Sequence, residues 1–425
     1  MNKVGAMADT SVLFRPIRIK NLEIKNRLVL GAASIASPNP DGTPSDESLA
    51  FYEKRCQGGV GLIITGVFMS TSHGWNGSGN TSAFFRIDDD SYIKAARRIP
   101  EITHKYSVPV IAQLLVSEGR MGKPGDYFSA ASEVGLVIPE QALACILKVP
   151  GGVTKPAPRA SDLEEVRRLR DETVESAVRC FKAGFNGVEI GAHMSYYLAT
   201  FISNRTNLRT DEYGGSRENR ARIVVELIQR IKAKTPENFV IGVRMSANEH
   251  TEGGQEAEEF AALAKIFEEA GADYIALTDG AYESPDVGIE GDATLYRHGE
   301  VQVFRKKISI PIMLQSVHDP VFASQIIEEK QCDMIMLVRP LIADPQFPNK
   351  LKNGKLSDIV QCDMNNECFR RIMMSLPMSC PQNPSFGNEV HKTGPKNNIE
   401  KLKANMMLRA AKSDLFMKIA SFFKK

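Results

Sequence analysis

The stretch at 190–198, which reads IGAHMSYYL, places a histidine next to two tyrosines. A tyrosine hydroxyl can give a proton to a reacting atom, and an imidazole can donate or accept a hydrogen bond. The preceding run NGVEI at 186–190 is apolar and has the composition of a buried strand. A lone histidine is more often structural, but His193 follows directly on this strand, which favours a functional role.

Two arginines stand at or near the ends of other apolar runs. Arg244 lies in FVIGVRM at 239–245, and Arg339 follows DMIMLV at 333–338. An arginine at the end of a buried strand is costly unless it meets an anion. The pair therefore indicates an anionic ligand, and the alternative is that each arginine pairs with a local carboxylate.

Three of the seven cysteines, Cys362, Cys368 and Cys380, fall in one short stretch. An odd number of cysteines in a long chain does not indicate a disulfide framework. Clustering of this kind is more typical of a metal site.

Eight short apolar runs supply the strands that must position these side chains. They are β-rich and apolar on both faces, as a parallel sheet covered on both sides requires. The runs lie at 27–33, 61–67, 108–115, 186–190, 239–245, 273–278, 311–316 and 333–338.

Helical patterns separate the strands, at 162–184, 216–234 and 256–271 among others. Strands alternating with helices predict an α/β fold, a (β/α)8 TIM barrel with a short cysteine-containing C-terminal extension. Chemistry in such barrels lies at the carboxyl ends of the strands. An open doubly wound sheet is the alternative, but no Gly-x-Gly-x-x-Gly follows the first strand.

Composition divides the chain and limits its partners. We expect a barrel over 1–360, a cysteine-containing segment over 361–390, and a linker with a basic amphipathic tail over 391–425. That tail packs on the barrel or contacts a membrane surface or a partner. The net charge of +2 gives no attraction to nucleic acid, and no apolar run is long enough for a membrane span. Without a secretory signal, a cytoplasmic location is expected.

Several motifs resemble the Old Yellow Enzyme family of NADH:flavin oxidoreductases. They are LFRPIRIKNLEIKNRLVLGAAS at 13–34, AGFNGVEI at 183–190 and NLRTDEYGGSRENRAR at 207–222. The resemblance covers roughly residues 13–390 and implies ene-reductase chemistry on a barrel that binds FMN.

The cysteine segment extends the resemblance. CDMNNEC at 362–368 and CPQNPSFG at 380–387 are similar to the iron–sulfur branch, which includes 2-enoate and 2,4-dienoyl-CoA reductases and bile-acid oxidoreductases. This implies a 4Fe-4S cluster on Cys362, Cys368 and Cys380. Members of that branch continue into a nucleotide-binding domain, and we expect this chain to lack it.

The resemblance also assigns roles to single residues. Tyr196 would be the proton donor and His193 a group that binds the substrate carbonyl. Met194, Tyr197 and Tyr282 would line the substrate pocket, although Tyr197 could simply pack, and Tyr282 with Glu283 could equally anchor a loop. The residues expected around FMN are Ala33, Ser34, Gln113, Arg244, Gln315, Ser316, Val338 and Arg339.

Other positions depart from the family pattern. Gln315-Ser316 and Val338 replace glycines of the phosphate site, and Asn365 replaces one cluster cysteine. Zinc, or no metal at all, is the alternative to the cluster. After the fourth strand, an ungapped alignment puts Met194 at a carbonyl-binding position, whereas a small shift puts His193 there.

The chain is thus interpreted as an FMN-dependent oxidoreductase that reduces, or in reverse forms, a carbon–carbon double bond conjugated to a carbonyl. An apolar small molecule is expected as substrate, such as an enoate, a steroid or a bile acid. NAD(P)H or a partner protein would supply electrons, and a homo-oligomer is considered. The alternatives are an amine dehydrogenase of the same family and a degenerate, non-catalytic or electron-transfer subunit.

Overall fold

The computed structural model describes residues 9–34, 38–79, 81–144, 149–284, 293–373, 378–387 and 389–390. The expected tail at 391–425 lies outside these residues. Among the helices that are described, none is long and apolar enough to cross a membrane.

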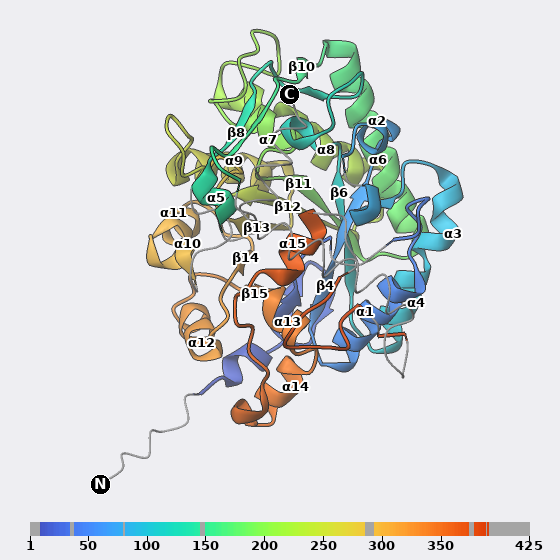
Figure 1. Cartoon of the computed structure of the whole chain (residues 1–425), viewed down its shortest axis with the longest axis vertical. Coiled ribbons are helices and arrows are strands. Elements are labelled where there is room, and N and C mark those ends of the chain that lie inside the picture. Colours follow the sequence, from blue (N-terminus) through green and yellow to red (C-terminus); the bar gives the residue numbers. More distant parts are fainter. Residues whose placement is uncertain are drawn as a thin grey trace.

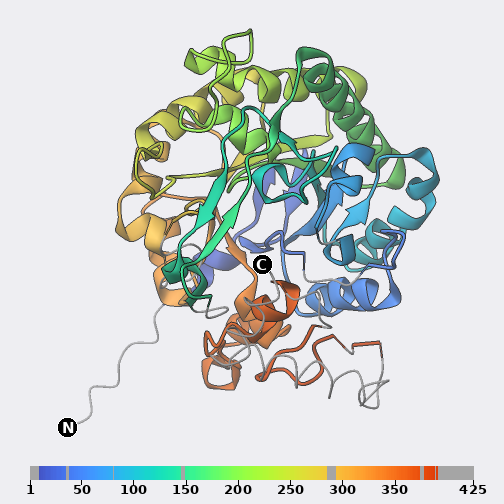
Figure 2. The ribbon, with the colours of Figure 1, turned by 45° about the horizontal axis from the view of Figure 1, so that its top comes forward.

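Eight parallel strands close into a barrel, which confirms the predicted fold class. The circle closes because the first barrel strand pairs with both the last one and the second one. Figure 2 shows the helices as an outer ring around these strands. In order, the strands are β3 (Leu28–Leu30), β4 (Leu62–Met69), β6 (Val110–Leu115), β11 (Gly187–Ala192), β12 (Val240–Ser246), β13 (Tyr274–Thr278), β14 (Ile312–Gln315) and β15 (Met334–Leu337).

Burial on both faces explains why the strands read as continuous apolar runs. Alternate residues fill the barrel interior, such as Val29, Ile64 and Met313, and the others pack under the helices. An antiparallel hairpin of β1 (Ile17–Ile19) and β2 (Leu22–Ile24) adds Ile19 and Ile24 to the interior cluster. The sequence reading did not predict this hairpin.

The three helices predicted from periodicity form as α6 (Leu163–Ala183), α8 (Arg217–Lys234) and α9 (Ala257–Ala270). The Asp162 side chain accepts a hydrogen bond from the Glu165 amide at the start of α6, which satisfies one free amide of the first turn. Gly184 ends α6 at φ +96°, a conformation that glycine adopts without strain.

Shorter elements complete the fold (Figure 1). The other helices are α1 (Asp46–Gln57), α2 (Ser72–Asn76), α3 (Ile93–Ala96), α4 (Arg98–Lys105), α5 (Glu140–Ala144), α7 (Tyr197–Ile202), α10 (Thr294–Arg297), α11 (Glu300–Lys307), α12 (Pro320–Glu328), α13 (Arg339–Ala343), α14 (Phe347–Lys352) and α15 (Glu367–Met373). The other strands are β5 (Phe85–Arg86), β7 (Ser129–Ala130), β8 (Leu136–Ile138), β9 (Val153–Lys155) and β10 (Arg159–Ala160). Of these, β8 and β9 form a hairpin whose apolar side packs against Tyr282.

Candidate active site

Tyr196 lies where β11 gives way to α7, at the carboxyl end of the fourth barrel strand. Its hydroxyl is 2.8 Å from the hydroxyl of Tyr282, and the two rings meet edge to face. Burial raises the pKa of Tyr196 to about 12, against a smaller lowering by the Tyr282 hydrogen bond. The phenol therefore keeps its proton at neutral pH, as a proton donor must.

His193 faces the same tyrosine, with ring centroids 5.2 Å apart. It is buried, and its Nδ1 atom has no hydrogen-bond partner. Burial, and then the positive charge of Arg244, hold the pKa of His193 well below its usual value. The imidazole is neutral at pH 7, so it can offer one N–H group to a substrate oxygen.

Arg244 comes from β12 and is almost completely buried. Its Nη1 donates to the carbonyl of Ala32 at 3.1 Å, and its Nη2 donates to Oε1 of Gln315 at 2.7 Å. Its Nε has no partner, and no carboxylate of the described residues lies within ion-pair distance. The buried Glu189 carboxylate acts on Arg244 through its charge but makes no direct ion pair with it.

A buried cation without a direct ion pair, at the barrel mouth, fits the electron-rich edge of a flavin ring. Arg244 would lie at that edge. Ser34 would lie nearby, since its hydroxyl already accepts a hydrogen bond of 3.3 Å from the Val67 amide at the end of the neighbouring strand. Ala33 borders the same place, because its carbonyl would be 2.9 Å from any Cβ added to Gly66. The residues present thus fit the group that the resemblance implies.

Gln113 of β6 points to a buried carboxylate inside the barrel. Its Nε2 donates to Glu189 at 2.8 Å, and the hydroxyl of Tyr274 donates to the same carboxylate at 3.0 Å. Burial raises the pKa of Glu189, and the nearby Arg244 opposes that effect. This network fixes the side chain of Gln113 directly below the mouth.

The ends of β14 and β15, where the FMN phosphate was expected to bind, keep part of the backbone geometry of such a site. Ser316 has φ +60°, in the left-handed region that favours glycine, so its backbone keeps the form expected of the glycine it replaces. The side chain of Gln315 is used by Arg244, and Val338 directly precedes α13. Arg339 donates from Nη1 to the sulfur of Met364 at 3.1 Å, which brings the cysteine segment against this arginine.

The three cysteines lie near one another. Burial, and then the thiols of Cys362 and Cys380, raise the pKa of Cys368 to about 11. Their sulfur atoms do not form a trio within 4.8 Å; among the described residues only His250, His298 and Glu300 do so.

Tyr197 and Met194 were both predicted to line the substrate pocket. Tyr197 has no exposed surface, and its hydroxyl is bonded to Ser161 at 3.0 Å. This burial favours the alternative that Tyr197 packs in the core. Met194 has φ +58°, in the left-handed region that favours glycine.

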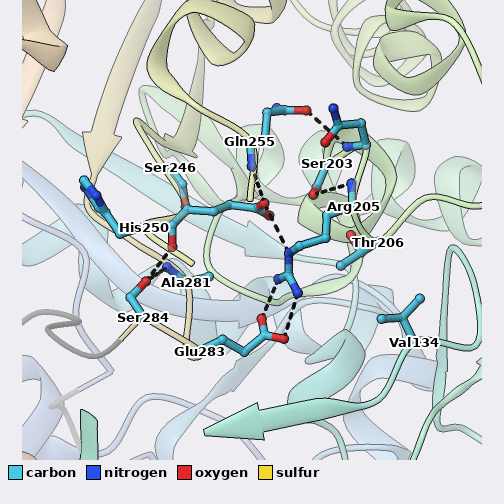
Figure 3. Close-up of polar contacts among 12 residues, drawn as sticks. Val134, Ser203, Arg205, Thr206, Ser246, His250, Gln255, Ala281, Glu283 and Ser284 are labelled. Carbon is cyan, nitrogen blue, oxygen red and sulfur yellow. Dashed lines mark hydrogen bonds and ion pairs between the residues drawn. The ribbon is translucent and has the colours of Figure 1, made fainter. Parts of the chain in front are cut away.

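A polar cluster beside the mouth is built on Glu283, and the sequence reading did not predict its two arginine partners. The Glu283 carboxylate accepts two hydrogen bonds from Arg205, at 2.6 and 3.0 Å, and two from Arg120, at 2.6 and 2.9 Å. Figure 3 shows the carboxylate facing the Arg205 guanidinium. Because Glu283 follows Tyr282 in the chain, the cluster fixes the loop that carries the partner of Tyr196.

Residues 12–358 match the family described as NADH:flavin oxidoreductase / NADH oxidase, and the chain belongs to this family of oxidoreductases. It is 34% identical over 383 residues to an NADH oxidase of Thermoanaerobacter brockii, covering 89% of this chain and 56% of that one. It is 33% identical over 405 residues to a cinnamate reductase of Clostridium sporogenes, covering 89% and 58%.

Among solved structures, a 2-naphthoyl-CoA reductase in complex with 2-naphthoyl-CoA superposes with a TM-score of 0.80 at 26% identity, covering 90% of this chain and 58% of that one. The chain therefore spans a little over half the length of these relatives. The resemblance to the Old Yellow Enzyme family with iron–sulfur relatives is confirmed.

Proposed function

We propose that the chain reduces, or in reverse forms, a carbon–carbon double bond conjugated to a carbonyl, with FMN as cofactor and Tyr196 as the proton donor. The observation that carries this proposal is the protonated Tyr196 hydroxyl at the end of β11, beside the neutral His193 and the buried cation Arg244. When bound, FMN would supply the hydride for the β-carbon.

The residues of the chain would do the rest of the chemistry. The Tyr196 hydroxyl would give its proton to the α-carbon, and Tyr282, 2.8 Å away, would hold that hydroxyl in place. The unpartnered Nδ1 of His193, if it carries the proton of the neutral ring, would donate to the substrate carbonyl and so withdraw charge from the double bond.

The apolar residues packed against Tyr196 favour an apolar substrate. Tyr196 packs against a buried cluster of Val67, Met69, Phe84 and Leu115. Such a wall suits an enoate, a steroid or a bile acid better than a charged amine, which favours the ene-reductase over the amine dehydrogenase. We include in the proposal a 4Fe-4S cluster on Cys362, Cys368 and Cys380, with NAD(P)H or a partner protein as the electron donor.

The proposal is tested with Tyr196→Phe, and Tyr197→Phe is the matched control. Both variants lose one tyrosine hydroxyl from the same segment, but only Tyr196 lies at the mouth. Tyr196→Phe should slow reoxidation of the reduced protein by an enone at least about 100-fold, with flavin reduction unchanged. Equal slowing of both half-reactions, or by both variants, would refute Tyr196 as the donor.

An anaerobic preparation separates the remaining alternatives. Its visible spectrum and its iron and sulfide content report flavin and cluster independently. Flavin without iron removes only the cluster from the proposal. A colourless protein contradicts the enzyme and favours the degenerate subunit.

A further inference from the structure

Two histidines and two carboxylates converge at the rim of the barrel, outside the site described above. His250 follows β12, Asp279 follows β13, His298 follows α10, and Glu300 is the first residue of α11. The ligand atoms of His250, His298 and Glu300 all lie within 4.8 Å of one another. The Nε2 atom of His250 is also 2.8 Å from Oδ1 of Asp279 and 3.0 Å from Oε1 of Glu300.

The polar atoms of this group are poorly satisfied by one another. Glu300 is only 5% exposed, and its Oε2 has no hydrogen-bond partner. The Nε2 of His250 and Oδ1 of Asp279 are close but lack hydrogen-bond geometry. A buried carboxylate that is not fully paired is costly, so a cation bound between these atoms would remove an existing penalty.

We propose that His250, His298 and Glu300 form a binding site for a divalent transition-metal ion, with Zn²⁺ as the best-suited ion and Asp279, which lies 2.8 Å from His250, moving in as the fourth ligand. Imidazole nitrogen and carboxylate oxygen are established zinc ligands at about 2.0–2.2 Å. Tetrahedral ligands at that distance lie about 3.3 Å apart. The observed separations of 2.8 and 3.0 Å around His250 need to widen only slightly.

The alternative is an ion pair without metal. The close carboxylates of Asp279 and then of Glu300 raise the pKa of His250 to about 10, so a protonated His250 can hold both of them by itself. The ion pair does not require the exposed His298, whose ring centroid lies 6.1 Å from that of His250. His298 therefore separates the two explanations.

The surroundings of the proposed site would let a metal ion enter, and its ligands suit an ion with a structural role. An open cavity of about 490 Å³ borders His250 and is also lined by Glu252 and Glu256, whose charges attract cations. Four protein ligands leave no open position, which is the arrangement of structural zinc. The ion would tie the segment after β12 to the loop that starts at Asp279 and carries Tyr282.

The test compares three forms of the full chain, each stripped with a chelator and then titrated with Zn²⁺. His298→Ala removes an exposed proposed ligand without breaking the ion pair around His250. His104→Ala is the control, because His104 is also exposed but lies on α4. The cysteines are the same in all three proteins, so zinc bound by them cancels in the comparison.

We expect wild type and His104→Ala to bind one more zinc ion per chain than His298→Ala, or to bind it at least about 10-fold more tightly. Zinc should also raise the melting temperature of the first two proteins more than that of the third. Identical stoichiometry, affinity and thermal shift in all three would overturn the proposal and leave the ion pair. Circular dichroism of the metal-free proteins checks that each is folded.

Discussion

Glu283 offers a sharp test of how the loop beside Tyr196 is held. Its largely buried carboxylate lies between two guanidinium groups, of which Arg120 is also buried and Arg205 is less so. Desolvation would raise the pKa of Glu283, but the hydrogen bonds from Arg205 and Arg120 outweigh it and lower the pKa. The substitution Glu283→Gln keeps the shape of the side chain and removes its charge.

The expected loss is large because two cations lose their counterion together. Removing one partner of a buried ion pair costs about 3–5 kcal/mol. Arg120 would keep a bond of 3.0 Å to the Val134 carbonyl, and Arg205 would keep a long contact of 3.5 Å to Glu249. Arg205→Gln should cost less, about 1–3 kcal/mol, because Glu283 then retains Arg120.

Urea-induced unfolding, followed by fluorescence and circular dichroism, measures both losses. Glu133→Gln is the matched control, because Glu133 is exposed and close in sequence to the Val134 that contacts Arg120. It should change the free energy of unfolding by less than about 0.5 kcal/mol. The reasoning is refuted if Glu283→Gln costs under about 1 kcal/mol, or if Arg205→Gln costs more than Glu283→Gln.

Four further predictions follow from the same structure. The first concerns pH: above pH ~4.3, the pKa of Glu in the unfolded chain, wild type should exceed Glu283→Gln in free energy of unfolding by the whole difference. This difference should vanish as acid protonates the folded carboxyl at its lowered pKa, and unfolding curves from pH 7 to 3 would show it. Gly242→Ala should destabilise the barrel by about 1–3 kcal/mol, because the added Cβ would come within 2.0 Å of the Tyr274 ring. Gly79→Ala is the control: Gly79 has open space around it, so this change should leave the free energy of unfolding nearly unchanged in the same assay. Arg244→Gln should weaken FMN binding at least about 10-fold in a fluorescence titration of the flavin-free protein, and unchanged affinity would remove Arg244 from the flavin site. Cys380→Ser should lower the iron content per chain if the cluster is present, whereas Cys56→Ser, at a buried cysteine outside the segment, should leave it unchanged.

The barrel could be predicted from the sequence because its signal is local. Each barrel strand is a short apolar run, and the predicted helices carry their own start and stop residues, such as Asp162 and Gly184 around α6. The hairpin of β1 and β2 was missed because its two strands have three residues each, too few to show an alternating pattern.

The site could be predicted only in part, because its contacts join distant segments. The place of Tyr196 follows from strand order, but its partner Tyr282 lies 86 positions away in the chain. No pattern in the sequence shows that Arg120, Arg205 and Glu283 meet. For Tyr197 the sequence left substrate contact and packing both open, because adjacent residues at the start of a helix point in different directions and only the structure shows which one faces the core.

The departures from the family pattern favour an altered site over a degenerate one. Ser316 replaces a glycine of the family pattern, yet its backbone is left-handed at φ +60°, the conformation that a glycine would adopt there without strain. Met194 beside His193 is also left-handed, at φ +58°, and each such residue costs of order 1 kcal/mol or more outside glycine. The Met194 amide donates to the Ser246 hydroxyl at 3.1 Å, which ties this residue to β12 beside Arg244. The mouth therefore keeps an ordered backbone and its buried cation where the sequence departs from the family pattern, as an altered but usable binding site requires.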